Sequence, residues 1–400
     1  MSKRLVLAPM GAILTSVLLA ALIAACAPQG KADVDTDALA EKLVAQCANI
    51  SEGDLVRVSG SVRDAKLLED IALRVRKLGA FPLVTLASER YAHRYYDEVP
   101  EKYDSQPRAL GMALADIFTA QIFVDVGVTP GLLADVPPER FAAQGKVDAP
   151  VNERLRERNV RFVNLGNDLY PTPALAKQYG LSREKLSSIF WDGVDTDYSE
   201  LQAAGERVKA VLSAGTELQI TAPNGTDLTL TITGRPALVS DGVISDEEME
   251  QGGAACQVWL PAGEVYLVPV PGSAQGTVVV DRHFYQGEEI INMTLTFEAG
   301  ALISMSAESG LEPLQARYDA AGAGKNLFGV MDIGLNPNVR IPTGSSMVAW
   351  MPAGMVTIGV GNNTWAGGDN STDFSVYPHL PGCTVTVDGQ TIVEEGKLAL

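Results

Sequence analysis

The sequence predicts an α/β N-terminal domain, a parallel sheet with helices, followed by a strand-rich α+β C-terminal domain. Two observations predict this division. In the first half, short apolar strands alternate with helical segments, which is the pattern of a parallel sheet with crossover helices. In the second half, strand-like segments follow one another between turn signals such as Asn224-Gly225 and Asp388-Gly389, as in an antiparallel sheet.

The first β-α-β unit supports the α/β assignment most directly. Residues 54–59 alternate as a strand, and residues 81–86 return to strand character. Between them Asp64 caps a run of apolar residues at helical spacing, which Gly79 ends. Looser repeats follow, with helices expected at 108–118 and 152–158 and strands at 122–126 and 160–164. No G-x-G-x-x-G lies in the first crossover, so a dinucleotide site is not indicated.

Two further expectations concern the middle of the chain. The tract from Pro137 to Pro150 predicts a loop, and residues 197–214 predict a long amphipathic helix. After that helix the apolar alternation predicts eight strands, at 217–222, 228–233, 265–270, 276–280, 290–297, 301–307, 355–360 and 384–387. The change of texture near Trp191 places an α/β domain at 36–188 and a second domain at 189–400.

The N-terminus has the three-part layout of a bacterial lipoprotein signal. The basic pair Lys3-Arg4 precedes an uncharged run, which ends in small residues directly before Cys26. We therefore expect a signal peptide at 1–25, lipid on the Cys26 thiol, and a flexible tether at 26–35. The predicted location is the bacterial cell envelope, with the exported protein anchored to a membrane through its lipid. An uncleaved membrane-spanning helix is the alternative.

The charge of the chain excludes nucleic acid as a partner. Residues 1–25 hold two of the 31 basic residues and none of the 49 acidic ones, so the mature chain would carry a net charge of −20. A surface this acidic repels nucleic acid and anionic lipid. The remaining cysteines, Cys47, Cys256 and Cys383, are widely spaced, so we expect small buried residues rather than a metal site.

Four stretches in the second half carry a family resemblance. They are I-T-A-P-N-G-T-D-L-T-L-T-I-T-G-R (220–235), L-P-A-G-E-V-Y-L-V-P (260–269), D-I-G-L-N-P (332–337) and G-G-D-N-S…C-T-V-T-V-D-G (367–389). In this order and spacing they resemble the thermophilic metalloaminopeptidase family, also called the aminopeptidase T or leucyl aminopeptidase-like family. The resemblance extends, more weakly, over the N-terminal β-α-β region.

The resemblance implies a two-domain protein that forms a homodimer and removes N-terminal amino acids with two divalent metal ions. It also implies five metal ligands in the second domain. The Glu of the P-x-G-E-V stretch is present as Glu264. The other four positions, which should be Glu, His, His and Asp, fall on Val330, Thr357, Ser375 and Tyr377. Since none of these four offers a carboxylate or an imidazole, the resemblance implies a degenerate site.

A rebuilt metal site is the alternative weighed against this. Of the three histidines, His93 is expected at a surface or an interface and His283 at a hairpin end, whereas His379 lies close to Ser375 in sequence. Glu264, Asp373 and His379 could then hold a displaced ion. The tryptophans Trp191, Trp259, Trp350 and Trp365 are expected to pack in the core or at an interface.

The sequence therefore predicts a lipid-anchored member of an aminopeptidase family without catalysis and without a cofactor. Its partners would be the membrane, through the lipid, a peptide or small molecule, and a second copy of the chain. One alternative is an active aminopeptidase that uses two zinc, cobalt or manganese ions in a rebuilt site. The other is a structural envelope lipoprotein.

Overall fold

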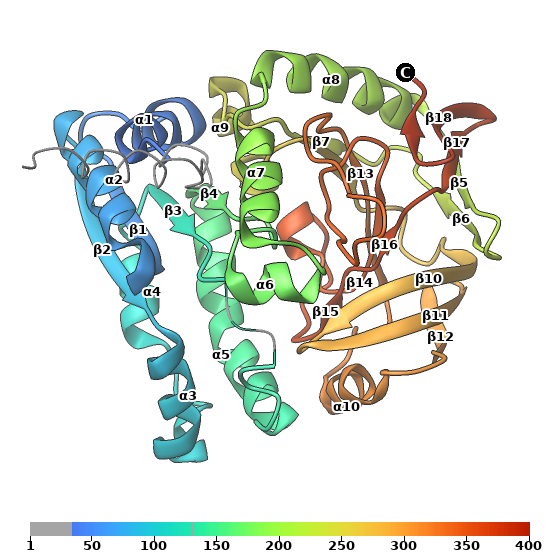
Figure 1. Ribbon diagram of the computed structural model, residues 1–400, viewed down its shortest axis with the longest axis horizontal. Coiled ribbons are helices and arrows are strands. Elements are labelled where there is room, and N and C mark those ends of the chain that lie inside the picture. The colour runs from blue at the N-terminus through green and yellow to red at the C-terminus, as the bar shows by residue number, and fades with distance from the viewer. Residues whose placement is uncertain (1–33, 128, 130) are drawn as a thin grey trace, which may run out of the picture. The chain divides into compact units, whose positions relative to one another are not determined.

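The computed structural model describes residues 34–127, 129 and 131–400 (Figure 1). The predicted signal peptide, Cys26 and most of the tether lie outside these described residues. None of the helices in the described ranges combines the length and apolar character that a membrane span requires.

A five-stranded sheet forms the N-terminal part, and all its neighbouring strands are parallel. The strand order is β2 (Phe81–Ala87), β1 (Leu55–Ser61), β3 (Ala120–Val124), β4 (Arg161–Leu165) and β8 (Gln257–Leu260). The predicted parallel sheet with helices is confirmed. The sequence missed β8, a four-residue strand from far along the chain that completes the sheet beside β4.

The helices follow the apolar spacing read from the sequence. In α2 (Ala65–Lys77) the residues at helical spacing are buried, and the helix packs on β1 and β2. Gly79 follows with φ of 79°, a left-handed conformation that glycine adopts without strain. The other α-helices are α1 (Thr36–Glu41), α3 (Glu89–Glu98), α4 (Ala109–Ala115), α5 (Pro138–Glu157), α6 (Pro173–Gln178), α7 (Arg183–Val194), α8 (Tyr198–Ala214), α9 (Asp246–Gln251) and α10 (Glu312–Ala320).

The loop predicted between Pro137 and Pro150 is wrong, because residues 138–150 belong to α5. Pro138 stands in the first turn, where the missing N–H has no intrahelical partner in any case. Pro150 lies inside the helix, which costs about 3 kcal/mol. Packing of α5 against α4 and α10, together with a buried ion pair between Arg140 and Asp104, offsets that cost.

The C-terminal part is strand-rich and antiparallel, as predicted, and its strands form two sheets. The larger has the order β12 (Ala301–Ser306), β11 (Glu288–Glu298), β10 (Gln275–Tyr285), β6 (Asp227–Thr231), β5 (Glu217–Thr221), β17 (Thr384–Val387), β18 (Gln390–Glu394) and β19 (Lys397–Leu398). The smaller has the order β15 (Ser375–Val376), β14 (Val356–Gly361), β13 (Phe328–Gly334), β9 (Glu264–Leu267) and β7 (Ala237–Ser240), with β16 (His379–Leu380) also paired to β14.

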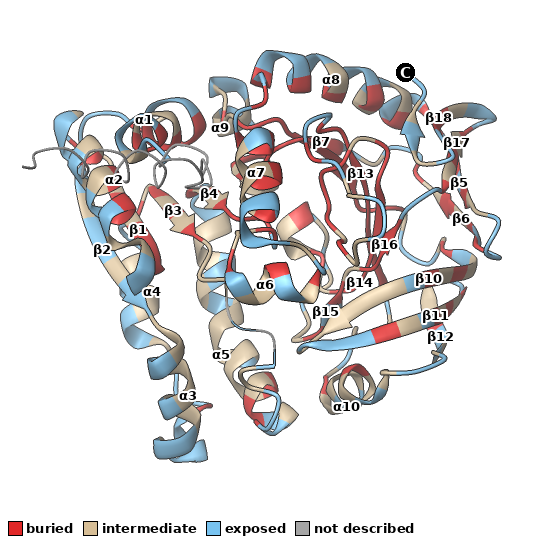
Figure 2. Ribbon diagram, in the orientation of Figure 1, coloured by how far each residue is buried: buried red, intermediate tan, exposed pale blue. Residues whose placement is uncertain are grey.

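The smaller sheet is the most deeply buried part of the fold. Every residue of β7, β9, β13 and β14 is buried, and Figure 2 shows these strands in red. Directly paired residues of antiparallel strands place their side chains on the same face. The register of this sheet therefore decides which polar side chains meet inside the protein.

The three cysteines of the described residues are all buried and free of disulfide bonds. They are Cys47, Cys256 and Cys383, and Cys47 and Cys383 pack in the main core. Burial raises the pKa of the Cys47 thiol and that of the Cys383 thiol to about 12. The expectation of small buried residues is confirmed.

Candidate functional site

One face of the smaller sheet collects a row of polar side chains. Glu264 on β9 is paired with Gly334, and Asp332 on β13 is paired with Tyr266 and with Thr357. Thr357 on β14 is in turn paired with His379 on β16. The register therefore aligns two carboxyl groups, a hydroxyl and an imidazole on one buried face.

Glu264 is the one expected metal ligand that the sequence retains, and it begins β9. Its side chain is 4% exposed, and its Oε1 accepts a 2.6 Å hydrogen bond from Nδ2 of Asn167. The pKa of Glu264 is raised to about 8, chiefly by burial; the Asn167 hydrogen bond acts to lower it and the nearby Asp168 carboxyl acts to raise it. The carboxyl is thus held in a low-dielectric place where its proton is favoured at neutral pH.

Asp332 is a second buried carboxyl group on the same face. It is 1% exposed, and within the described ranges its Oδ1 atom has no hydrogen-bond partner. Burial raises the pKa of Asp332 well above the ordinary carboxyl value, and the neighbouring Glu264 raises it further. A protonated Asp332 is the form that this environment favours.

Thr357 and His379 are hydrogen-bonded to each other. The Thr357 Oγ1 atom and the His379 Nδ1 atom are 2.7 Å apart, and both residues are buried. The His379 ring also contacts the Trp350 ring edge-on, with centroids 5.4 Å apart. Burial, with a smaller contribution from His283, lowers the pKa of His379 to about 3, so the imidazole is neutral at pH 7.

The remaining ligand positions are held in apolar or hydroxyl contacts. Val330 is fully buried in a small apolar cluster with Leu238 and Tyr266. The Tyr377 hydroxyl accepts a 2.9 Å hydrogen bond from Trp365 Nε1 and donates one of 3.2 Å to a backbone carbonyl. Ser375 lies at the start of β15 and is exposed to solvent.

Asp373, one of the two residues considered for a rebuilt site, faces α10 instead. Its Oδ1 accepts a hydrogen bond of 3.0 Å from the backbone N–H of Gly322, and its Oδ2 lies 3.7 Å from Nη1 of Arg317. The other, His379, is bonded to Thr357. Across residues 34–127, 129 and 131–400, no group of three or more His, Cys, Asp or Glu side chains is arranged to hold a metal ion.

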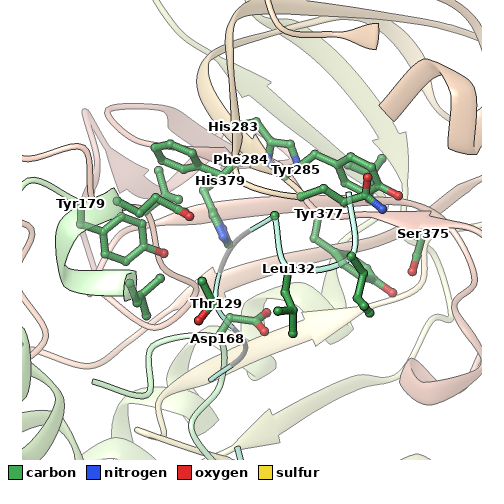
Figure 3. Close-up of a pocket in the computed structure, with 18 of the residues that line it drawn as sticks. Thr129, Leu132, Asp168, Tyr179, His283, Phe284, Tyr285, Ser375, Tyr377 and His379 are labelled. Atoms are coloured by element: carbon green, nitrogen blue, oxygen red, sulfur yellow. The ribbon is translucent and has the colours of Figure 1, made fainter. Parts of the chain in front are cut away.

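Two adjoining cavities open beside this face. The larger, of about 510 Å³, is lined by Asp168, Tyr179, His283, Ser375, Tyr377 and His379 among others (Figure 3). The smaller, of about 230 Å³, is lined by Asn164, Asn167, Asp168, Trp259, Glu264, Trp350, Trp365 and Tyr377. Asp168, Trp350 and Tyr377 line both cavities, so they form the wall that the two cavities share.

The turn after β4 supplies functional residues that the sequence did not indicate. Asn167 and Asp168 have φ of 45° and 59°, a left-handed conformation that is uncommon outside glycine. Asn167 reaches Glu264, and Asp168 accepts a 3.3 Å hydrogen bond from Trp350 Nε1. The only signal was their position at the carboxyl end of a parallel strand, where ligands of α/β sheets bind.

Comparison with known proteins gives one family and several relatives. A family model described as thermophilic metalloprotease (M29) matches residues 33–327. The match therefore includes Glu264 and ends before Val330. A curated relative, aminopeptidase 2 of Geobacillus stearothermophilus, is 23% identical over 316 residues, which is 73% of this chain and 75% of that protein.

Two solved structures share the fold over nearly their whole length. Wild-type AmpT from Thermus thermophilus is 20% identical with a TM-score of 0.70, covering 91% of this chain and 99% of that one. The 2,5-dihydroxypyridine dioxygenase of Pseudomonas putida is 14% identical with a TM-score of 0.60, covering 92% of this chain and 98% of that one. Since the similar proteins include both an aminopeptidase and a dioxygenase by name, the fold alone does not decide a reaction.

Proposed function

This chain belongs to the thermophilic metalloprotease (M29) family, and from that premise we propose that it binds a peptide or small molecule without peptidase chemistry. The proposed location is the cell envelope, with a lipid on Cys26 as the anchor. The observation that carries the proposal is the set of side chains at the five ligand positions expected from the resemblance.

Those side chains do not fit a site for two divalent metal ions. A catalytic zinc takes about three anionic or imidazole ligands, and here the five positions offer one carboxyl group. The bond from Asn167 already occupies one oxygen of Glu264. Val330 has no lone pair, and Thr357 and Tyr377 use their hydroxyl groups on His379 and Trp365.

Binding does not depend on those ligands. The larger cavity, at about 510 Å³, lies within the range of about 300–1,000 Å³ that is typical of small-molecule sites. Its wall combines rings, such as Tyr179 and Phe284, with a few polar groups, such as Asp168 and His379. This mixture of apolar surface and convergent polar groups suits a ligand that is held and not cleaved.

A homodimer is part of the proposal, and the edge strand β2 supports it. Phe81, Leu83, Val84 and Leu86 on this strand are 41–58% exposed. In the described sheet β2 has one neighbour, β1, so its outer edge is unpaired. Because an exposed apolar edge strand invites pairing with another chain, a second copy is the proposed occupant.

Metal analysis and peptidase assays on the same preparation test the proposal. We expect far less than one zinc, cobalt or manganese ion per chain after dialysis, and no release of amino acids from leucyl or aromatic peptides with added metal. The active-aminopeptidase alternative gives the opposite result: near-stoichiometric metal and activity, both lost in His379→Ala. His93→Ala is the matched control, because His93 is half-exposed on α3. Metal bound without activity would leave a structural ion and keep the proposal.

A further inference from the structure

The smaller cavity, of about 230 Å³, is walled by aromatic rings from four separate segments. Trp259 is on β8, Trp350 precedes β14, Trp365 is in a short 3₁₀ turn, and Tyr377 joins β15 to β16. Neighbouring ring centroids lie 5.3 Å apart for Trp259 and Trp365, and 5.1 Å apart for Trp350 and Tyr377. Folding thus gathers, around one cavity, three of the four tryptophans that the sequence assigned to core or interface packing.

Acidic side chains complete the wall. Asp168 and Glu264 line the cavity, and their hydrogen bonds come from neutral groups, Trp350 Nε1 and Asn167 Nδ2. Among the described residues that line this cavity there is no Lys, Arg or His. Asp168 is exposed, so its carboxyl group can carry a charge, and no cationic side chain in the described wall of this cavity pairs with it. The wall therefore favours a positively charged ligand over a neutral or negative one.

The size of the cavity limits that ligand. It is far larger than the share of about 30 Å³ that one water molecule takes in the liquid, and smaller than the cavities of about 300–1,000 Å³ that hold drug-sized ligands. The faces of Trp and Tyr rings attract cations, most strongly when the cation is desolvated. A quaternary ammonium group suits this wall, because it carries charge, is weakly hydrated and needs no hydrogen-bond acceptor.

We propose that this cavity binds a small quaternary ammonium group, with the rings of Trp259, Trp350 and Trp365 against its methyl groups and Asp168 supplying charge. The inference deepens the proposed function and rests on it, since it names the class of small molecule that a non-catalytic member of the family would hold. The larger cavity adjoins this one across Asp168, Trp350 and Tyr377, and can take the rest of the ligand.

Calorimetric titration of the full-length chain tests the proposal with four probes at constant ionic strength. Tetramethylammonium and choline are expected to bind with Kd of about 1 mM or lower, the affinity that a few cation–π contacts give. The uncharged analogue 3,3-dimethylbutan-1-ol and the primary ammonium ion of n-butylamine are expected to bind at least about tenfold more weakly. Equal binding of the alcohol would overturn the charge argument, and tighter binding of butylammonium would assign the cavity to primary amines.

Variants place the binding in this cavity. Trp365→Leu and Asp168→Asn are each expected to weaken tetramethylammonium binding about tenfold or more. The matched controls are Trp191→Phe, on α7 outside the cavity, and Glu200→Gln, an exposed acid on α8; both keep the affinity of the unaltered chain. Circular dichroism checks the fold of each variant. If a variant does not fold, titration of the unaltered chain with the four probes still decides whether it prefers a quaternary ammonium group.

The failure of this inference and the failure of the proposed function are distinguishable. The titrations contain neither metal nor peptide, whereas the proposed function is tested by metal content and peptide cleavage. Absence of tetramethylammonium binding up to about 10 mM overturns the inference and leaves a non-catalytic binder of another ligand. Metal-dependent peptide cleavage overturns the proposed function, whatever the titrations show.

Discussion

Asn167 Nδ2 donates a 2.6 Å hydrogen bond to Oε1 of Glu264, and this bond joins the turn after β4 to the first residue of β9. Asn167 is 8% exposed and Glu264 4%. The bond therefore links the parallel sheet to the buried antiparallel sheet and fixes the carboxyl group that the family would give to a metal.

The chain offers a matched pair of asparagines to measure this bond. Asn292 also has a left-handed backbone, with φ of 49°, and its Nδ2 donates a 2.6 Å bond to Glu308, but that bond is exposed. Both Asn167→Ala and Asn292→Ala lose a bond and strain the same backbone conformation. We expect Asn167→Ala to lower the free energy of unfolding by about 1–3 kcal/mol more than Asn292→Ala does, because Asn167→Ala leaves a buried acceptor unpaired. If urea denaturation gave equal losses of unfolding free energy for the two variants, the buried bond would add nothing to stability beyond an exposed one.

The dimer prediction concerns β2. Leu86→Glu places a charge on a 58%-exposed residue of the apolar edge strand, so the monomer should keep its stability while the dimer dissociates. Light scattering at micromolar concentration should give the mass of two chains for the unaltered protein and of one chain for the variant. A mass near one chain without the substitution would contradict the dimer, and Glu200→Gln on α8 should change nothing.

The lipid anchor is tested by Cys26→Ser. Because the thiol is the acylated atom in a bacterial lipoprotein, the variant should move from the membrane pellet to the soluble fraction or remain as an unprocessed precursor. Cys256→Ala, which changes a buried cysteine, should stay in the pellet. An unchanged distribution of Cys26→Ser with its N-terminus intact would favour a spanning helix.

The pH dependence of stability is expected to reflect the buried pair of Asp104 and Arg140. Oδ2 of Asp104 lies 2.5 Å from Nε of Arg140, and this partner holds the pKa of the carboxyl below its usual value. A carboxyl group whose pKa is lowered by folding stabilises the protein at pH values above its unfolded pKa of about 3.9. This stabilisation is lost as the pH falls through the folded pKa. Asp104→Asn should thus cost about 3–5 kcal/mol at pH 7, and progressively less below about pH 4.

Asp148 gives the control for that pair. It contacts Arg108 at 2.6 Å, but its side chain is 49% exposed. Asp148→Asn should therefore cost no more than about 1 kcal/mol at pH 7. A loss for Asp104→Asn that does not change with pH would show that the ion pair is not its source.

Periodic segments could be predicted from the sequence, and contacts between distant segments could not. The apolar spacing of α2 and the alternation of β10 and β11 reflect faces that each element buries by itself. The Asn167–Glu264 bond joins residues 97 positions apart, and nothing local to either residue indicates the other. The part of α5 up to Pro150 was missed for the same reason, since the packing partners of the helix offset the local cost of Pro150.

At the site, too, local motifs could be identified from the sequence, and contacts between distant segments could not. Glu264 could be identified because it lies within a contiguous motif, and the positions of Val330 and Thr357 followed from the resemblance. The gathering of Trp259, Trp350 and Trp365 depends on three segments that meet only in the folded chain.

Restoring one ligand should not restore a metal site. Val330 is fully buried against Tyr266 and Leu238, on the central strand β13 of the smaller sheet. Val330→Glu puts a carboxylate into this apolar cluster, on the face that already holds the buried carboxyls of Glu264 and Asp332. Without a compensating cation we expect a loss of about 3 kcal/mol or more in the free energy of unfolding.

The control for that substitution is Val62→Glu, because Val62 is 49% exposed, lies outside β2, and a charge there keeps its water. It should change the free energy of unfolding by about 0.5 kcal/mol or less. Addition of zinc or cobalt should leave the Val330→Glu loss unrepaired, because Thr357, Ser375 and Tyr377 still supply no imidazole or carboxylate. If the metal instead restored stability and elemental analysis found about one ion per chain, then Glu264 and the new carboxylate would be sufficient to bind one metal ion. The family's metal site would in that case be one substitution away, and the alternative of a rebuilt site would regain its physical basis.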